Sequence, residues 1–231
     1  MALFKRKTKE VKENYSYPDI SAIDEIEKFM PMKEYGCQGE LEEILRGKTL
    51  VGYLGPNESL YDVKEEDYKT LQRRGVTYEQ IAGSLESIIQ GVNNSIGQEK
   101  PKKSRVLMDK NYSAVEDRNL AAYEIEIERK EAAVCPWSQL FQEYPELSCS
   151  YGKHEGRYEA QENYEFTVKN LNLKKSFRFY SISPHLIREH KFFEGKKTKL
   201  KLIYTRNPYR VEPEEASEVL GLIKSGNDKV K

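Results

Sequence analysis

Six side chains of the kinds that carry most nucleophilic, proton-transfer and transition-metal chemistry lie in one part of the chain. All three histidines, the only tryptophan and two of the three cysteines fall between positions 135 and 190: Cys135, Trp137, Cys149, His154, His185 and His190. Thiolate sulfur and imidazole nitrogen are ligands that zinc prefers, and a cysteine beside a histidine can also act as a nucleophile. The grouping therefore raises two chemical hypotheses, a metal site and thiol chemistry.

The spacing within this group disfavours a metal site. Cys135 and Cys149 are 14 positions apart, whereas zinc ribbons and fingers usually place paired ligands about two to four residues apart. His185 and His190 are five positions apart, which is about 140° around a helix, so their rings are not expected on one face. We therefore assign no metal ligand and no cofactor. Zinc stays an alternative function, with the two cysteines, the two histidines and His154 as its candidate ligands.

Thiol chemistry would need a histidine beside one of the two cysteines in the folded chain. Cys135 or Cys149 could be activated by His154, His185 or His190, but no local motif of a cysteine hydrolase surrounds either cysteine. The simpler interpretation makes both cysteines and the nearby tryptophan buried core residues. The sequence thus favours a protein that is not an enzyme.

A different kind of site is predicted where a strand runs into a helix. Ser183 is expected to be the N-cap of that helix, with Pro184 in its first turn. The free backbone amides of a helix N-terminus bind phosphate, sulfate or carboxylate groups. The candidate anion-binding residues are Ser181, Ser183, His185, Arg188 and Arg206.

The same region resembles, in part, the strand signature of RNA-recognition domains. Lys175, Phe177 and Phe179 match that signature, and the residues between and after them depart from it. Three glutamates alternate along 123–128, which places carboxylates on one face of a predicted strand and repels a phosphate backbone. RNA binding is therefore a third alternative, and nucleic acid is not an expected partner.

The composition limits the class and location of the protein. Hydrophobic residues make up 38% and charged residues 33% of the 231 positions, which indicates a thin core and solvated helices. The 38 basic and 38 acidic residues balance, so the basic excess of a general nucleic-acid binder is missing. No apolar run approaches the roughly 20 residues needed to cross a bilayer. With no secretory signal and only three cysteines, we expect a soluble cytoplasmic protein without a membrane partner.

Apolar residues recur at helical spacing through the first half of the chain. Thr77-Tyr-Glu-Gln has the form of a capping box, and Gly91 is expected to end the helix that begins there. The predicted helices cover 21–29, 41–46, 65–74 and 77–91, with a short strand over 49–55.

Alternation with a period of two takes over in the second half. Strands are predicted over 123–128, 164–168, 177–180 and 200–204, and helices over 136–144, 183–193 and from 213 onward. Up to residue 204 the order is strand, helix, strand, strand, helix, strand, which is the ferredoxin-like order. A plain antiparallel sheet with helices on one face is equally compatible. Either way the predicted class is α+β.

These elements suggest two domains between polar tails at 1–14 and 225–231. A small, mainly helical domain with one strand covers 15–92, a polar linker covers 93–104, and an α+β domain covers 105–224. The first functional hypothesis is a non-enzymatic binding or protein-interaction module. Its expected partner is a protein or a small anionic ligand. In this tyrosine-rich chain Tyr151 and Tyr158 are the candidate contact residues.

Overall fold

The structure is a computed structural model of the whole chain. It describes residues 20–46, 53–97, 102–138, 149, 151, 153–154, 157–158, 161–195, 197–200, 203–206 and 210–223. Both predicted tails lie outside these residues, as do most of the strand expected over 49–55 and of the helix expected over 136–144. Of that helix the structure describes only 136–138, which form a single 3-10 turn.

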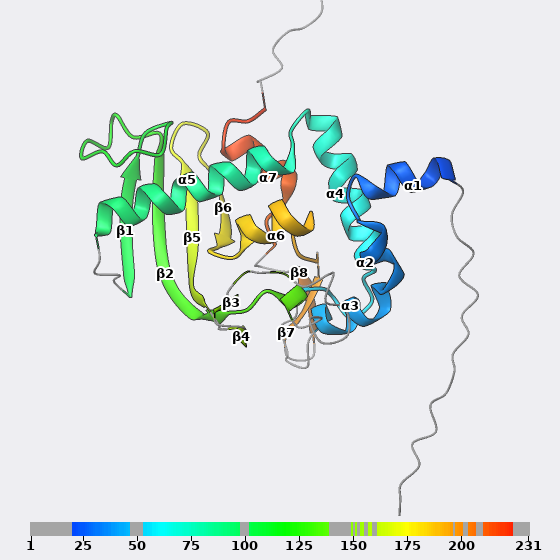
Figure 1. Cartoon of the computed structure of the whole chain (residues 1–231). Coiled ribbons are helices and arrows are strands. Elements are labelled where there is room, and N and C mark those ends of the chain that lie inside the picture. The colour runs from blue at the N-terminus through cyan, green and yellow to red at the C-terminus, as the bar shows by residue number, and fades with distance from the viewer. Residues whose placement is uncertain are drawn as a thin grey trace, which may run out of the picture.

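A four-stranded antiparallel sheet forms the centre of the second half (Figure 1). Its strands lie side by side in the order β1 (Lys103–Met108), β2 (Tyr123–Ala133), β5 (Gln161–Asn170) and β6 (Lys175–Tyr180). Every pair of neighbours is antiparallel. The α+β class is therefore confirmed. Of the two predicted topologies, the plain antiparallel sheet is the observed one, because β2 lies directly beside β5, whereas the ferredoxin-like order places another strand between these two.

The two faces of this sheet differ as the alternation predicts. Ile125, Phe166 and Phe179 point into the core and are 0–2% exposed. On the opposite face, Glu126 of β2 accepts a hydrogen bond of 2.7 Å from Arg105 of β1. The aromatic residues of β6 thus face the core, and the outer face carries paired charges, so this sheet does not offer the exposed aromatic surface on which RNA bases stack.

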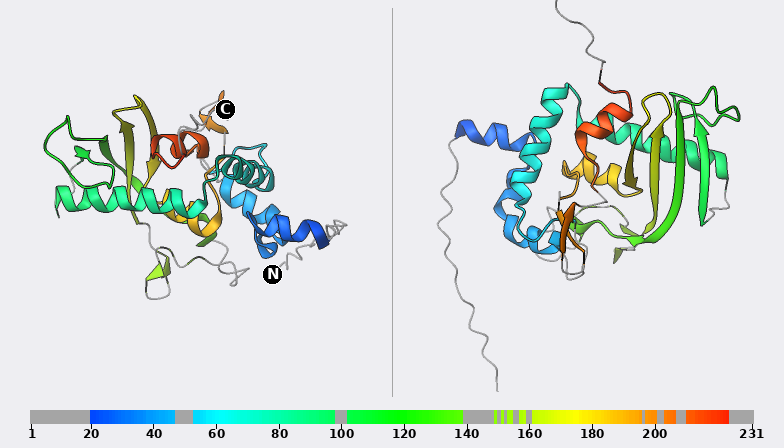
Figure 2. Two further views of the ribbon diagram at one scale, coloured as in Figure 1. Left: turned by 90° about the horizontal axis from the view of Figure 1, so that it is seen from above. Right: turned by 180° about the vertical axis from the view of Figure 1, so that it is seen from behind.

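Three helices cover the apolar face of the sheet, as Figure 2 shows from above and from behind. They are α5 (Tyr78–Ile96), α6 (Ser183–His190) and α7 (Pro213–Val219). The predicted capping box at Thr77 is present, with reciprocal hydrogen bonds to Gln80. α5 does not end at Gly91 but continues to Gly97, whose φ of 66° suits a glycine. The linker predicted over 93–104 therefore overlaps the last turn of α5 and the start of β1.

Four N-terminal helices pack around a second apolar core. They are α1 (Ile20–Glu27), α2 (Met32–Gly36), α3 (Gln38–Arg46) and α4 (Leu60–Arg74). Their buried residues, such as Leu41 and Leu60, cluster with Trp137, Leu186 and Phe192 from the second half of the chain. By contrast, α5 packs into the core under the sheet. The N-terminal helices and the second half of the chain therefore share a core.

Two short hairpins complete the described structure. β3 (Lys153–His154) pairs with β4 (Arg157–Tyr158), and β7 (Lys197–Leu200) pairs with β8 (Ile203–Arg206). The single strand predicted over 200–204 is wrong, because Leu200 is the last residue of β7 and pairs with Ile203, the first residue of β8. The alternation of Leu200, Leu202 and Tyr204 in the sequence resembles one continuous strand and did not reveal the two strands. Among the described residues, no helix is both long and apolar enough to cross a membrane.

Candidate metal centre

Four of the cysteine and histidine residues singled out in the sequence converge on one point. The ligand atoms of Cys135, Cys149, His185 and His190 all lie within 4.8 Å of one another. His185 Nε2 lies 3.1 Å from Cys149 Sγ and 3.4 Å from Cys135 Sγ, and His190 Nε2 lies 3.4 Å from Cys135 Sγ. Tetrahedral zinc, with bonds of about 2.3 Å to sulfur and about 2.0–2.1 Å to nitrogen, separates its sulfur and nitrogen ligands by about 3.5 Å. The four atoms are therefore close to the arrangement of a tetrahedral metal site.

The two cysteines come from the segments that leave and re-enter the sheet. Cys135 follows the end of β2 and opens the 3-10 turn, where Ser138 donates both its backbone N–H and its hydroxyl to the Cys135 carbonyl. Cys149 lies before Tyr151, whose backbone N–H donates to Cys149 Sγ over 3.2 Å. Hydrogen bonds of this kind stabilise a thiolate, so the local backbone favours sulfur in its metal-binding form.

Both histidines come from α6, where their spacing predicted separate faces. His185 lies in the first turn and His190 is the last residue of the helix. Their ring centroids are 5.0 Å apart with an edge-to-face geometry. A spacing of five positions does not exclude this approach, because two side chains that leave a helix in different directions can still meet at a point beside it. Here that point is set by the cysteine sulfurs, which lie outside the helix.

The four side chains are largely removed from water. Cys135 is fully buried, Cys149 and His190 are 8% and 6% exposed, and His185 is half-buried. The prediction that both cysteines and Trp137 are core residues is confirmed.

The surroundings shift the pKa values of the two thiols in opposite directions. Burial and the adjacent Cys149 sulfur raise the pKa of Cys135 well above its usual value. Contact with Cys135, together with His185 and His190, lowers the pKa of Cys149 despite its burial. One thiolate is thus already favoured at neutral pH, which suits the binding of a cation.

Aromatic rings lie against both imidazoles. Trp137 stacks on His190 with ring centroids 4.0 Å apart, and Tyr151 stacks on His185 at 4.3 Å. Such contacts restrict the rotation of the two imidazole rings. Tyr151, which the sequence suggested as an interaction residue, therefore lies against the cluster.

A buried ion pair borders the cluster on the side of the N-terminal helices. Glu34 of α2 accepts a hydrogen bond of 3.0 Å from Trp137 Nε1 and one from Lys64 of α4. Burial favours the neutral form of Glu34, but Lys64 and His190 hold its pKa below the usual value. Sequence reasoning missed both residues, because nothing in the sequence distinguishes them from the many other charged residues of the chain.

The serines of the predicted anion site are used inside the fold. Ile182, not Ser183, is the N-cap of α6, and it makes no side-chain capping bond. The Ser183 hydroxyl instead accepts the backbone N–H of Tyr180 over 3.0 Å. Ser181 likewise accepts the backbone N–H of Tyr164 over 3.0 Å. The predicted N-cap is wrong, because Ser183 already lies within the helix and its hydroxyl is directed to the end of β6.

One cationic residue of that predicted site, Arg188, is paired within the fold. Arg188 binds Glu79 and Glu86 of α5 and so joins α5 to α6. Arg206 lies in β8, and His154 and Tyr158 lie in the β3–β4 hairpin; the side chains of all three fall outside the described residues. Among the described side chains of the anion set, His185 contacts the cysteine pair.

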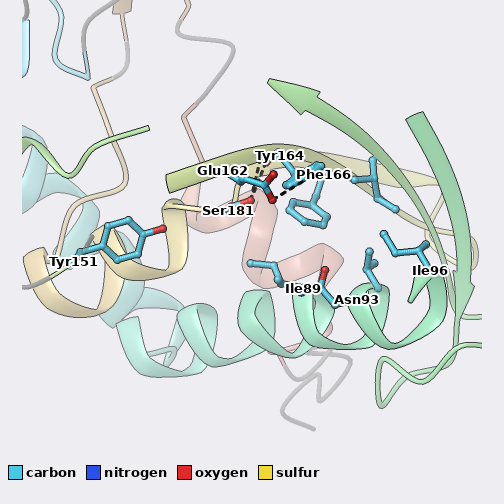
Figure 3. A pocket seen from close by; sticks show the side chains of 10 residues that line it. Ile89, Asn93, Ile96, Tyr151, Glu162, Tyr164, Phe166 and Ser181 are labelled. Atoms are coloured by element: carbon cyan, nitrogen blue, oxygen red, sulfur yellow. Dashed lines mark hydrogen bonds between the residues drawn. The ribbon is translucent and has the colours of Figure 1, made fainter. Parts of the chain in front are cut away.

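Ser181 and Tyr151 also line a pocket of about 240 Å³ between α5 and β5. In Figure 3 Ile89 of α5 and Phe166 of β5 line the pocket from opposite sides, and Tyr151 lies toward one end. Glu162 adds a carboxylate on the β5 side. A pocket with this lining disfavours an anion, because an acidic group repels it.

Comparison with known proteins identifies no relative: no family model, no curated protein and no solved structure matches this chain.

Proposed function

We propose that this protein binds one zinc ion through Cys135, Cys149, His185 and His190, and that the metal has a structural role. The observation that carries the proposal is the convergence of these four ligand atoms within 4.8 Å at a largely buried point. Two of the chain's three cysteines and two of its three histidines meet there. Side chains separated by up to 55 positions in sequence would add little stability by meeting at one point unless a bound ligand held them together.

The chemistry of the four ligands favours zinc over other cations. Thiolate and imidazole select zinc, whereas magnesium and calcium prefer oxygen ligands. Two thiolates balance the double positive charge, so the bound site is neutral and suits a buried position. Four protein ligands complete a tetrahedron and leave no position for a substrate, which is typical of structural zinc.

The metal would join segments that are remote in sequence. The ligands come from the exit of β2, the segment before Tyr151, and both ends of α6. Structural zinc contributes about 10–16 kcal/mol of binding free energy in zinc-finger peptides near neutral pH. A contribution even well below this range exceeds what most single contacts supply, so zinc would fix these segments around the second core.

Elemental analysis of the purified protein tests the proposal. We expect about one zinc per chain, and about one cobalt after exchange, with the visible absorption of tetrahedral cobalt–thiolate coordination. Cys149→Ser and His185→Ala should each lose most of the metal.

The chain supplies matched controls for both substitutions. Cys37 is a buried cysteine outside the cluster, and His154 is the third histidine of the chain. Cys37→Ser and His154→Ala should keep the metal. Metal-free wild-type protein that also fails to take up added zinc or cobalt would refute the proposed function.

Thiol catalysis is the second candidate, because His185 lies within 3.1 Å of Cys149. Both sulfurs are buried, and a second cysteine–histidine pair lies beside the first. These two features favour zinc binding over thiol catalysis. Iodoacetamide separates the two functions. Fast alkylation of Cys149 that added zinc does not slow favours a nucleophile. Alkylation that occurs only after chelation favours a metal ligand.

A further inference from the structure

The two ring nitrogens of His190 face different partners. Nε2 lies 3.4 Å from Cys135 Sγ, on the side of the cluster. Nδ1 lies 3.9 Å from Glu34 Oε1, on the side of the N-terminal helices. A histidine that binds a metal through Nε2 carries its proton on Nδ1, and such a proton is commonly donated to a carboxylate.

Glu34 is held in place to receive that proton. Its side chain is 4% exposed. Trp137 Nε1 donates to Oε1 over 3.0 Å, and Lys64 donates to Oε2. Trp137 also stacks on the His190 ring. The same indole therefore contacts both the carboxylate and the imidazole. The two groups lie 3.9 Å apart, so a hydrogen bond between them requires a small rotation of one of them.

The charges of this region balance when the metal is bound. Zinc and two thiolates sum to zero, and Glu34 and Lys64 form a second neutral pair. With neutral imidazoles the buried assembly carries no net charge, which is the condition under which buried ions are tolerated. Glu34 is thus not needed as a fifth ligand, and its carboxylate is available to the imidazole.

We infer that Glu34 is a positioning residue of the zinc site, which accepts the Nδ1 proton of His190 and holds Nε2 toward the metal. This inference rests on the proposed zinc site. Through Glu34 the N-terminal helices would contribute to the metal affinity, although they supply no ligand. α2 brings Glu34 to the site and α4 brings its counterion, so metal binding and the packing of these helices are coupled.

Zinc affinity of the double variant Glu34→Gln/Lys64→Met tests the inference, because this change removes the carboxylate without leaving a buried lysine unpaired. The matched control is Asp67→Asn/Arg210→Met, which neutralises another buried ion pair of α4 away from the cluster. Loss of an outer-shell partner typically weakens metal binding about 10–100-fold. We expect this loss in the first variant only, with an unchanged tetrahedral cobalt spectrum, measured by competition with a chromophoric chelator.

A second measurement needs no variant. In zinc-loaded wild-type protein, nitrogen-15 spectra should show His190 bound through Nε2, with a slowly exchanging proton on Nδ1. Coordination through Nδ1, or equal zinc affinity in wild type and the Glu34→Gln/Lys64→Met variant, would overturn the role of Glu34 and leave the zinc site standing. Absence of zinc binding by the wild type would instead remove the proposed function itself.

Discussion

At the scale of single residues, the two cysteines of the cluster are expected to differ in protonation state before a metal binds. Contact with Cys135 and the two histidines lowers the pKa of Cys149, which favours its thiolate. Burial and the adjacent Cys149 raise the pKa of Cys135, which favours its thiol. Zinc binds only thiolates, and binding must therefore displace the proton of Cys135.

Zinc binding near pH 7 should thus release about one proton per chain, rather than the two expected from a pair of ordinary thiols. Calorimetric titrations in buffers of different ionisation enthalpy measure this number. Zinc affinity should also fall as the pH is lowered, because protons then compete for Cys149 as well. Release of two protons at neutral pH would contradict the lowered pKa of Cys149.

The only tryptophan of the chain reports on the same site. Trp137 is fully buried, stacks on His190 and donates to Glu34. Chelation should loosen these contacts and admit water, which shifts the emission of an indole to longer wavelength. We expect this shift in the wild type on addition of a chelator. Cys149→Ser should already emit at longer wavelength and respond little, whereas Cys37→Ser should behave as the wild type does.

At the scale of elements, a buried ion pair joins α4 to the segment before α7. Asp67 of α4 receives hydrogen bonds from Arg210, which is 6% exposed and also binds the Glu194 carbonyl. Breaking a buried pair by removing one charge typically costs about 3–5 kcal/mol. Asp67→Asn should therefore lower the free energy of unfolding by about this amount, as measured by urea denaturation. Its zinc content should stay at the wild-type level, which separates this contact from the metal site.

Elements with strong local signals were predictable from the sequence. The capping box at Thr77 and the alternating strand around Ile125 depend on neighbouring residues, and both were placed correctly. α2 has only five residues, too few for a helical period to show. β1 was missed because its first half, Lys103 to Arg105, is polar and reads as part of a linker.

The candidate site was predictable in its members but not in its geometry. Residue types alone singled out Cys135, Cys149, His185 and His190 among the candidates. Their convergence depends on where β2 ends relative to α6, which is a property of the tertiary fold. The contact of Glu34 with Trp137 also depends on the tertiary fold, because the two residues lie 103 positions apart in sequence. Glu34 belongs to no recognisable sequence motif.

At the scale of the whole molecule, two apolar cores meet beside the candidate zinc site. One lies between the sheet and the helices α5 and α7, with residues such as Leu85 and Val168. The other joins the N-terminal helices to the two cysteines, Trp137 and part of α6. Tyr68 packs against both. The metal ligands belong mainly to the second core, so loss of zinc should not affect the molecule evenly.

Amide hydrogen exchange with and without a chelator tests this asymmetry. Removal of zinc should speed exchange in α2, α4 and α6, because their packing depends on Glu34, Lys64 and the two histidines of α6. The central strands β2 and β5 should keep their protection, since their inward side chains pack against α5 and α7. Local openings of different free energy within one protein are common, and they follow such boundaries between cores. Equal loss of protection in the sheet and in the N-terminal helices would show instead that both cores unfold as one unit and that zinc stabilises all of it.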